Sequence, residues 1–187
     1  MKKILEFGFR LALVSAVASG MLTYMYQITS PRIAENARRQ KEEMLKYVLP
    51  GADRLETKVI EGQEIIIGYT GQKLVGVALQ VSSPGYGGPI QLLVGVSPKG
   101  RAWPIAILAD KETPGLGKKI HDYWFRQQFV GKEARQMRLK MDSPEGTIDA
   151  VSSATISSRA VTRGIRQAME QVRDFVSQGL VERSQGG

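Results

Sequence analysis

The chain has 187 residues, 42% of them hydrophobic, and a formal net charge of +8, which suits one domain with an appendage. It contains no cysteine and a single histidine, His121, which excludes disulfides, iron–sulfur ligation, c-type haem attachment, a thiolate nucleophile and a histidine-based metal cluster. A basic chain first suggests nucleic acid, but the lysines and arginines are dispersed and no helix-turn-helix or aromatic stacking motif occurs, so we expect no nucleic-acid binding.

An uncharged apolar segment runs from Leu11 to Ile28. As a helix it would extend about 27 Å, close to the thickness of the hydrocarbon core of a bilayer. Ala16-Val17-Ala18 resembles a signal-peptidase site, but the hydrophobic stretch continues well beyond it, which favours a retained anchor. Basic residues flank the segment almost evenly, so they do not set its orientation. We assign residues 1–29 to a transmembrane anchor.

A second helix is predicted after the anchor. Ser30-Pro31 has the pattern of an N-cap followed by proline at the first helical position, and Pro50-Gly51 would end the helix. Between them lies an apolar stripe made of Ile33, Ala37, Met44, Leu45 and Val48. We assign residues 30–56 to this connecting helix and a linker.

Strand patterns begin near Thr57 and continue to Asp110. Residues 64–69 and 73–81 flank Thr70-Gly71-Gln72 as a hairpin. Alternate residues of the second segment are apolar, which indicates one buried face.

Two more strands are expected at residues 90–96 and 102–108, and Pro104 predicts that the latter is an edge strand or carries a bulge. Consecutive hairpins without intervening helices favour an antiparallel sheet. We therefore predict an α+β domain with flanking helices over residues 57–180.

The rest of the chain is expected to be helical, with a loose tail at residues 181–187. A short helix is predicted at residues 121–129, with His121 as a partly exposed residue at its start. A longer amphipathic helix is predicted after Ser158, where apolar residues recur at helical spacing. These residues are Val161, Ile165, Ala168, Val172 and Val176.

The run Asp149-Ala150-Val151-Ser152-Ser153-Ala154-Thr155-Ile156-Ser157-Ser158 consists mainly of small and hydroxyl residues and ends where this helix begins. A hydroxyl at a helix N-terminus faces free backbone N–H groups and the positive end of the helix dipole. A phosphate attached there would be stabilised without a dedicated basic residue. The plain alternative, favoured on physics alone, is a capping turn with Ser157 or Ser158 as the N-cap.

Two glycine-containing loops precede this run. Glu112-Thr113-Pro114-Gly115-Leu116-Gly117 contains the Pro-Gly pair of a type II turn, which needs no ligand. Trp124 and then Phe129-Val130-Gly131-Lys132 follow it. Gly85-Tyr86-Gly87-Gly88-Pro89-Ile90 lacks the spacing of a P-loop or a dinucleotide fingerprint. The plain alternatives for Glu112 and Asp149 are a solvated loop charge and a turn-capping carboxylate.

Together these segments resemble the FMN-binding domain family. The last run is similar to the family's flavinylation motif, D-x-x-S-G-A-T, with matches at Asp149, Ser152, Ala154 and Thr155. Ser153 stands where glycine is usual, and glycine adopts φ > 0 freely. We interpret this serine as a tolerated variant. The resemblance implies one FMN carried by Thr155 through a phosphoester bond, which a flavin transferase attaches during maturation.

The two loops also match the family. Its E-T-P-G-L-G loop packs around the isoalloxazine ring, which implies that Glu112, Thr113, Leu116 and Gly117 belong to the flavin pocket. The glycine at position 117 would let the backbone approach the ring. The earlier loop resembles G-Y-x-G-x-I and adds Tyr86. The resemblance implies no catalytic acid, base or nucleophile and no metal.

Over its whole length the chain resembles the G subunits of Rnf ion-translocating electron transport complexes, which are related to the C subunits of sodium-translocating NADH:quinone reductases. The resemblance implies a single-pass flavoprotein of the bacterial inner membrane, with its flavin domain on the periplasmic side. Its partners would be the membrane and iron–sulfur subunits of a ferredoxin:NAD oxidoreductase. Two alternatives stay open: a membrane-anchored binding or scaffold module without a redox role, and a flavin-binding sensor domain.

Overall fold

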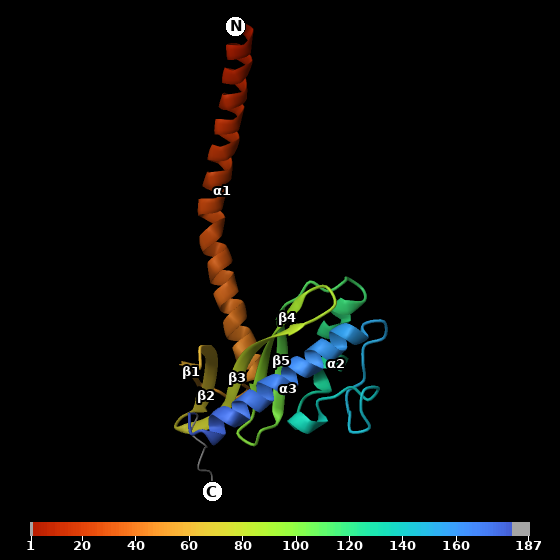
Figure 1. Cartoon of the computed structure of the whole chain (residues 1–187). Helices are drawn as coiled ribbons and strands as arrows, with labels where there is room; N and C mark the ends of the chain where they lie inside the picture. The colour runs from red at the N-terminus through yellow and green to blue at the C-terminus, as the bar shows by residue number, and fades with distance from the viewer. Residues whose placement is uncertain (1, 181–187) are drawn as a thin grey trace. The chain divides into compact units, whose positions relative to one another are not determined.

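The computed structural model describes residues 2–180, without the side chains of residues 2–6, 31, 33, 34, 36–38, 40 and 41 (Figure 1). The chain divides into two compact units, Met1–Glu43 and Met44–Gly187. The expected tail at residues 181–187 lies outside the described residues.

Helix α1 (Lys2–Val48) is one continuous helix where two were predicted. It passes through Ser30-Pro31, so the N-cap predicted at Ser30 is wrong. Proline removes one backbone hydrogen bond, and that loss is local because residues on both sides keep their helical conformation. Of the predicted stripe, the side chains of Ile33 and Ala37 lie outside the described residues.

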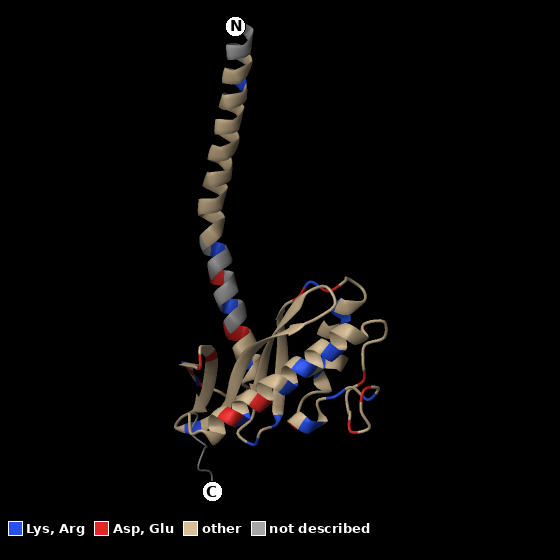
Figure 2. Cartoon of the chain, viewed as in Figure 1, with Lys and Arg blue, Asp and Glu red and all other residues tan. Residues whose placement is uncertain are grey.

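The segment Phe7–Ser30 of α1 is long and apolar enough to cross a membrane. No charged residue occurs between Leu11 and Ser30 (Figure 2). Its large apolar side chains, such as Phe9 and Leu22, are exposed in the structure, as a lipid-facing helix requires.

The second unit is built on a five-stranded antiparallel sheet in which the strands follow chain order. The strands are β1 (Arg54–Ile60), β2 (Gln63–Thr70), β3 (Lys73–Pro84), β4 (Pro89–Val96) and β5 (Ala102–Ala109). The predicted α+β class is confirmed. Pro104 lies on β5, which is an edge strand as expected, where a missing N–H costs no ladder bond on its outer side.

Helix α3 (Thr155–Ser177) covers one face of this sheet (Figure 1). It lies against β3 and β4 and buries the predicted stripe except Val176, which is half-buried. Val161 and Ile165 are completely inaccessible. On the sheet these side chains meet Leu79 and Leu92 in the larger core. The helix begins at Thr155, earlier than predicted.

The opposite face of the sheet is covered by the last turn of α1. Leu45, Val48 and Leu49 are buried there in a second, smaller core. Their partners from the strands are Ile66, Ala78, Leu93 and Ala106. The sheet is therefore the middle layer of three.

Short helical turns connect β5 to α3: η1 (Gly117–His121), α2 (Tyr123–Gln127) and η2 (Ala134–Gln136). The predicted helix at residues 121–129 is thus shorter than expected. Phe125 and Phe129 anchor this region because both are fully buried, and their rings meet edge to face with centroids 5.2 Å apart.

Candidate functional site

An open cavity of about 630 Å³ lies where three segments of the second unit meet. These segments are the loop after β3, the loop after β5 and the start of α3. The cavity is lined by Tyr86, Glu112, Thr113, Leu116, Gly117, Ser153, Ala154, Thr155, Ile156 and Ser157. The cavity therefore brings together eight of the ten predicted site residues. The volume of the cavity is in the range of small-molecule sites.

Thr155 is the first residue of α3 and is half-buried in the cavity wall. The N-cap residue, Ala154, makes no side-chain capping bond. The first backbone N–H groups of a helix have no carbonyl within the helix to bind. This end of a 23-residue helix therefore offers N–H donors and a positive dipole end beside the Thr155 hydroxyl.

Ser157 and Ser158 are not N-caps, because both lie inside the first turn of α3. The Ser158 hydroxyl donates to the carbonyl of Ala154 at 2.9 Å and accepts the N–H of Val151 at 2.9 Å. It thereby ties the flavinylation-like run back onto the helix. Ser157, which was expected only as a possible cap, lines the cavity and points to Glu112 instead.

Ser153 has a φ of 65°, in the left-handed region. The position where the family carries glycine therefore does adopt the conformation that glycine favours. Within the described part of the chain, Glu61, with a φ of 52°, is the other non-glycine residue in this region. Ser153 lies two residues before the start of α3 at Thr155.

Glu112 is buried, with 3% of its surface exposed, so the alternative of a solvated loop charge is wrong. Its Oε1 atom accepts the N–H of Tyr86 at 2.8 Å and that of Gly87 at 3.2 Å. Its Oε2 atom accepts the hydroxyl of Ser157 at 2.7 Å. Glu112 lies in the loop after β5, and its side chain thus binds the other two segments that form the cavity.

Asp110 holds the start of the Glu112 loop. Its Oδ1 atom accepts the N–H of Glu112 at 2.9 Å, and its Oδ2 atom lies 2.6 Å from Nε2 of His121. Burial tends to raise the pKa of Asp110, but the hydrogen bonds from His121 and from the backbone of Glu112 outweigh it and hold the pKa below its ordinary value. His121 is partly exposed, as expected, and lies at the end of η1.

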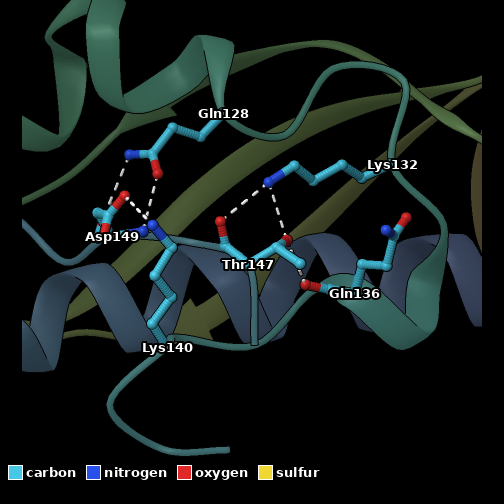
Figure 3. Close-up of polar contacts among 6 residues, drawn as sticks. All are labelled: Gln128, Lys132, Gln136, Lys140, Thr147 and Asp149. Atoms are coloured by element: carbon cyan, nitrogen blue, oxygen red, sulfur yellow. Dashed lines mark hydrogen bonds and ion pairs between the residues drawn. The ribbon is translucent and has the colours of Figure 1, made fainter. Parts of the chain in front are cut away.

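Asp149 and Ser152 do not line the cavity. Asp149 is exposed, and its Oδ2 atom pairs with Nζ of Lys140 at 2.7 Å (Figure 3). The side chain of Gln128 holds the backbone of Asp149, accepting its N–H at 2.8 Å and donating to its carbonyl at 3.2 Å. Nothing in the sequence marked Gln128, because its partner lies 21 residues away.

Lys132 holds the residues just before this run. Its Nζ atom donates to the carbonyl of Thr147 at 2.9 Å and to its hydroxyl at 2.8 Å, and the hydroxyl donates to the carbonyl of Gln136 at 3.0 Å (Figure 3). Burial lowers the pKa of Lys132 and the nearby charge of Lys140 lowers it further, against the opposing effect of Asp149. The segment that leads to Thr155 is thus anchored from outside the cavity.

The cavity combines two kinds of surface. At the start of α3, free N–H donors and a hydroxyl suit a phosphate group. Tyr86, Leu116 and Ile156 are exposed apolar or aromatic side chains on the same cavity and suit a flat ring system. The residues present therefore fit a phosphorylated aromatic cofactor such as FMN.

Two family models match the chain: the FMN-binding domain over residues 85–170 and the RnfG N-terminal region over residues 1–48. The G subunit of the proton-translocating ferredoxin:NAD(+) oxidoreductase complex of Clostridium ljungdahlii is 33% identical, over 88% of this chain and 89% of that protein. The G subunit of the Na(+)-translocating ferredoxin:NAD(+) oxidoreductase complex of Acetobacterium woodii is 30% identical, over 90% and 91%.

Among solved structures, the C subunit of the Na(+)-translocating NADH-quinone reductase from Parabacteroides distasonis has a similar fold, with a TM-score of 0.52. It is 19% identical, and the match covers 62% of this chain and 63% of that one. At this identity the likeness concerns the fold alone, and it agrees with the α+β architecture described above.

Proposed function

The chain belongs to the family of G subunits of Rnf ion-translocating oxidoreductase complexes, and on that premise we propose that it is their membrane-anchored FMN protein, which carries electrons in a ferredoxin:NAD⁺ oxidoreductase. Bound FMN would supply one- and two-electron transfer. The protein's part is to attach the cofactor, orient it and set its surroundings. It acts as a redox component of a translocase and does not catalyse the reaction alone.

We further propose that the FMN is esterified to Thr155 by a flavin transferase. The observation that carries this proposal is the position of Thr155, which lines the cavity at a helix N-terminus without a side-chain cap. The N–H groups of the first turn would hold the phosphate. Tyr86, Leu116 and Ile156 would border the ring, and Thr113 would complete the pocket. Asp149 and Ser152 would act from outside it.

The same proposal places the domain on the periplasmic side of the inner membrane, attached through α1. The segment from Leu11 to Ile28 has no ionisable residue except two tyrosines, and buried charged residues usually mark ion pathways. Ion translocation would therefore be carried by other membrane subunits. We expect this chain to co-purify with them and with iron–sulfur subunits.

The test is an intact-mass measurement on the full chain purified from its native membrane. We expect the mass of one FMN less one water above the polypeptide, and flavin fluorescence that survives denaturation. Thr155→Ala should abolish both signals because alanine has no hydroxyl to esterify. Thr155→Ser should retain part of them, and Thr57→Ala, an exposed threonine on β1, should retain all. Unmodified peptide at Thr155 in native protein would refute covalent attachment.

Two alternatives differ in these observables. A scaffold module without a redox role would carry no flavin in any preparation. A sensor domain would carry flavin but would not co-purify with iron–sulfur subunits. Membership of the G-subunit family favours the electron carrier over both.

A further inference from the structure

We propose that Glu112 is a positioning residue: it assembles the cavity by joining three distant segments through one buried carboxylate, and so sets where α3 begins. The hydrogen bonds that hold the three segments together involve protein groups only, whereas the consequence for flavin binding rests on the proposed function. In this role Glu112 does not bind the cofactor with its carboxylate oxygens, which accept hydrogen bonds from protein groups. It affects the cofactor by holding the segments that line the cavity.

The contacts of Glu112 are long-range. Its partners Gly87, Tyr86 and Ser157 lie 25, 26 and 45 residues away in the sequence. All three donate to the carboxyl group, whose two oxygens act as acceptors. A buried carboxylate needs such compensation, because burial without partners is costly. The loop after β3 and the first turn of α3 are therefore held by the same group.

Two glycines leave the space that this carboxylate fills. A Cβ atom at Gly85 would collide with Oε1 of Glu112. A Cβ atom at Gly117 would lie 2.6 Å from Oε2 and 2.8 Å from Cβ of the same side chain. The glycine at position 117 therefore makes room for Glu112, where the resemblance had suggested close approach to the ring. Gly85, Gly117 and the buried side chain of Glu112 therefore pack together as one unit.

Asp110 and Ser157 show how this unit is oriented. Asp110 accepts the backbone N–H of Glu112 at 2.9 Å, and the side chain of Glu112 accepts the hydroxyl of Ser157 at 2.7 Å. Ser157 lies in the first turn of α3, two residues after Thr155 in the chain. Any movement of the Glu112 carboxylate is thus transmitted to the helix start that carries the Thr155 hydroxyl.

The test uses the full chain in detergent and begins in a Thr155→Ala background, where no flavin can be attached. Amide hydrogen exchange is followed at Tyr86, Gly87 and Ser158, whose N–H groups all have hydrogen-bond acceptors in the structure. Glu112→Met keeps the length of the side chain and removes both acceptors, so exchange at Tyr86 and Gly87 should become about tenfold faster.

Glu112→Gln should restore most of the protection. Its carbonyl oxygen can accept the two N–H groups, and its amide can donate to the Ser157 hydroxyl, which then acts as acceptor. Glu145→Met, a change at an exposed acid outside the cavity lining, is the matched control and should leave exchange at these sites unaltered. If Glu112→Met does not fold, Ser157→Ala should still speed exchange of the Ser158 N–H, which donates to the carbonyl of Ala154 at 2.9 Å.

The second arm restores Thr155 and measures flavin occupancy with the transferase present. Occupancy should fall most in Glu112→Met and less in Glu112→Gln. Unchanged exchange at Tyr86 and Gly87 in Glu112→Met would overturn the proposal, whatever the flavin content. Equal acceleration in Glu112→Gln would also overturn it, because the acceptor geometry would then not be what holds the loops. Absence of flavin from the parent protein would refute the proposed function and leave the exchange result to decide the role of Glu112.

Discussion

Replacing Ser153 by glycine should stabilise the domain and raise flavin occupancy. Ser153 has a φ of 65°, and the left-handed conformation costs a non-glycine residue about 1–2 kcal/mol. Glycine avoids this cost, but its greater conformational entropy in the unfolded chain destabilises the fold by about 0.4–1 kcal/mol. The net gain should be about 1 kcal/mol, which for a chain of this size raises the unfolding midpoint by about 2–4 °C.

Two glycine substitutions serve as controls for Ser153→Gly. Glu61 also has a positive φ, 52°, in the turn between β1 and β2 and outside the cavity lining. Glu61→Gly should therefore match the thermal gain and leave flavin occupancy unaltered. Ser152 lies outside the left-handed region, so Ser152→Gly should lose about 0.5–1 kcal/mol.

The assay is thermal unfolding of the full chain in detergent, in the Thr155→Ala background, with flavin occupancy measured separately in chains that keep Thr155. Occupancy should rise in Ser153→Gly because the turn before α3 is populated more fully in the conformation that presents Thr155. A lower unfolding midpoint in Ser153→Gly would refute the strain argument. A marked loss of flavin would show that the Ser153 hydroxyl itself takes part in attachment.

Three other outcomes are expected. Leu116→Ala should shift the absorbance of the bound flavin without preventing attachment, because Leu116 is 45% exposed and lines the cavity. An unaltered absorbance spectrum would place the flavin ring elsewhere. Because the fold lowers the pKa of Asp110 below 3.8, its carboxylate stabilises the fold above that pH, and this stability is lost as the pH falls through the lowered pKa. Asp110→Asn should thus be less stable than the parent protein at pH 7 and nearly as stable in acid. A difference in unfolding free energy that stays constant down to acid pH would contradict this. Gln178 is exposed at the end of α3, so the cysteine of Gln178→Cys should react with an impermeant maleimide once the outer membrane is permeabilised. Labelling only after rupture of the inner membrane would place the domain on the cytoplasmic side.

Much of the fold follows from periodicity in the sequence. Alternating apolar residues predicted β3, and the stripe from Val161 to Val176 predicted α3, because each pattern reports a buried face. Strand β1 was not identified as a separate strand because most of its side chains are exposed, so it carries no alternation. The break predicted at Ser30-Pro31 relied on a local signal that a long helix overrides.

The candidate site was predicted mainly through its resemblance to a known family, and its internal organisation was not. Spacing cannot indicate that Glu112 would meet Ser157, since 45 residues separate them. Ser157 and Ser158 looked like caps because hydroxyls commonly cap helices, but both lie inside α3. In the structure the Ser157 hydroxyl binds a carboxylate brought from another loop. Ser153 differs from these residues, because the glycine usual in the resembling motif raised the question of a positive φ there, and Ser153 has a φ of 65°.

The last turn of α1 has a consequence for how the domain can be isolated and how it forms. Val48 packs so closely on β4 that a Cβ atom at Gly95 would collide with its carbonyl oxygen. A fragment starting at residue 57 would therefore leave Ile66 and Leu93 without cover, whereas one starting before Met44 would keep both layers. During synthesis the last turn of α1 leaves the ribosome before the strands, so its hydrophobic face stays exposed until β2 to β5 have been made.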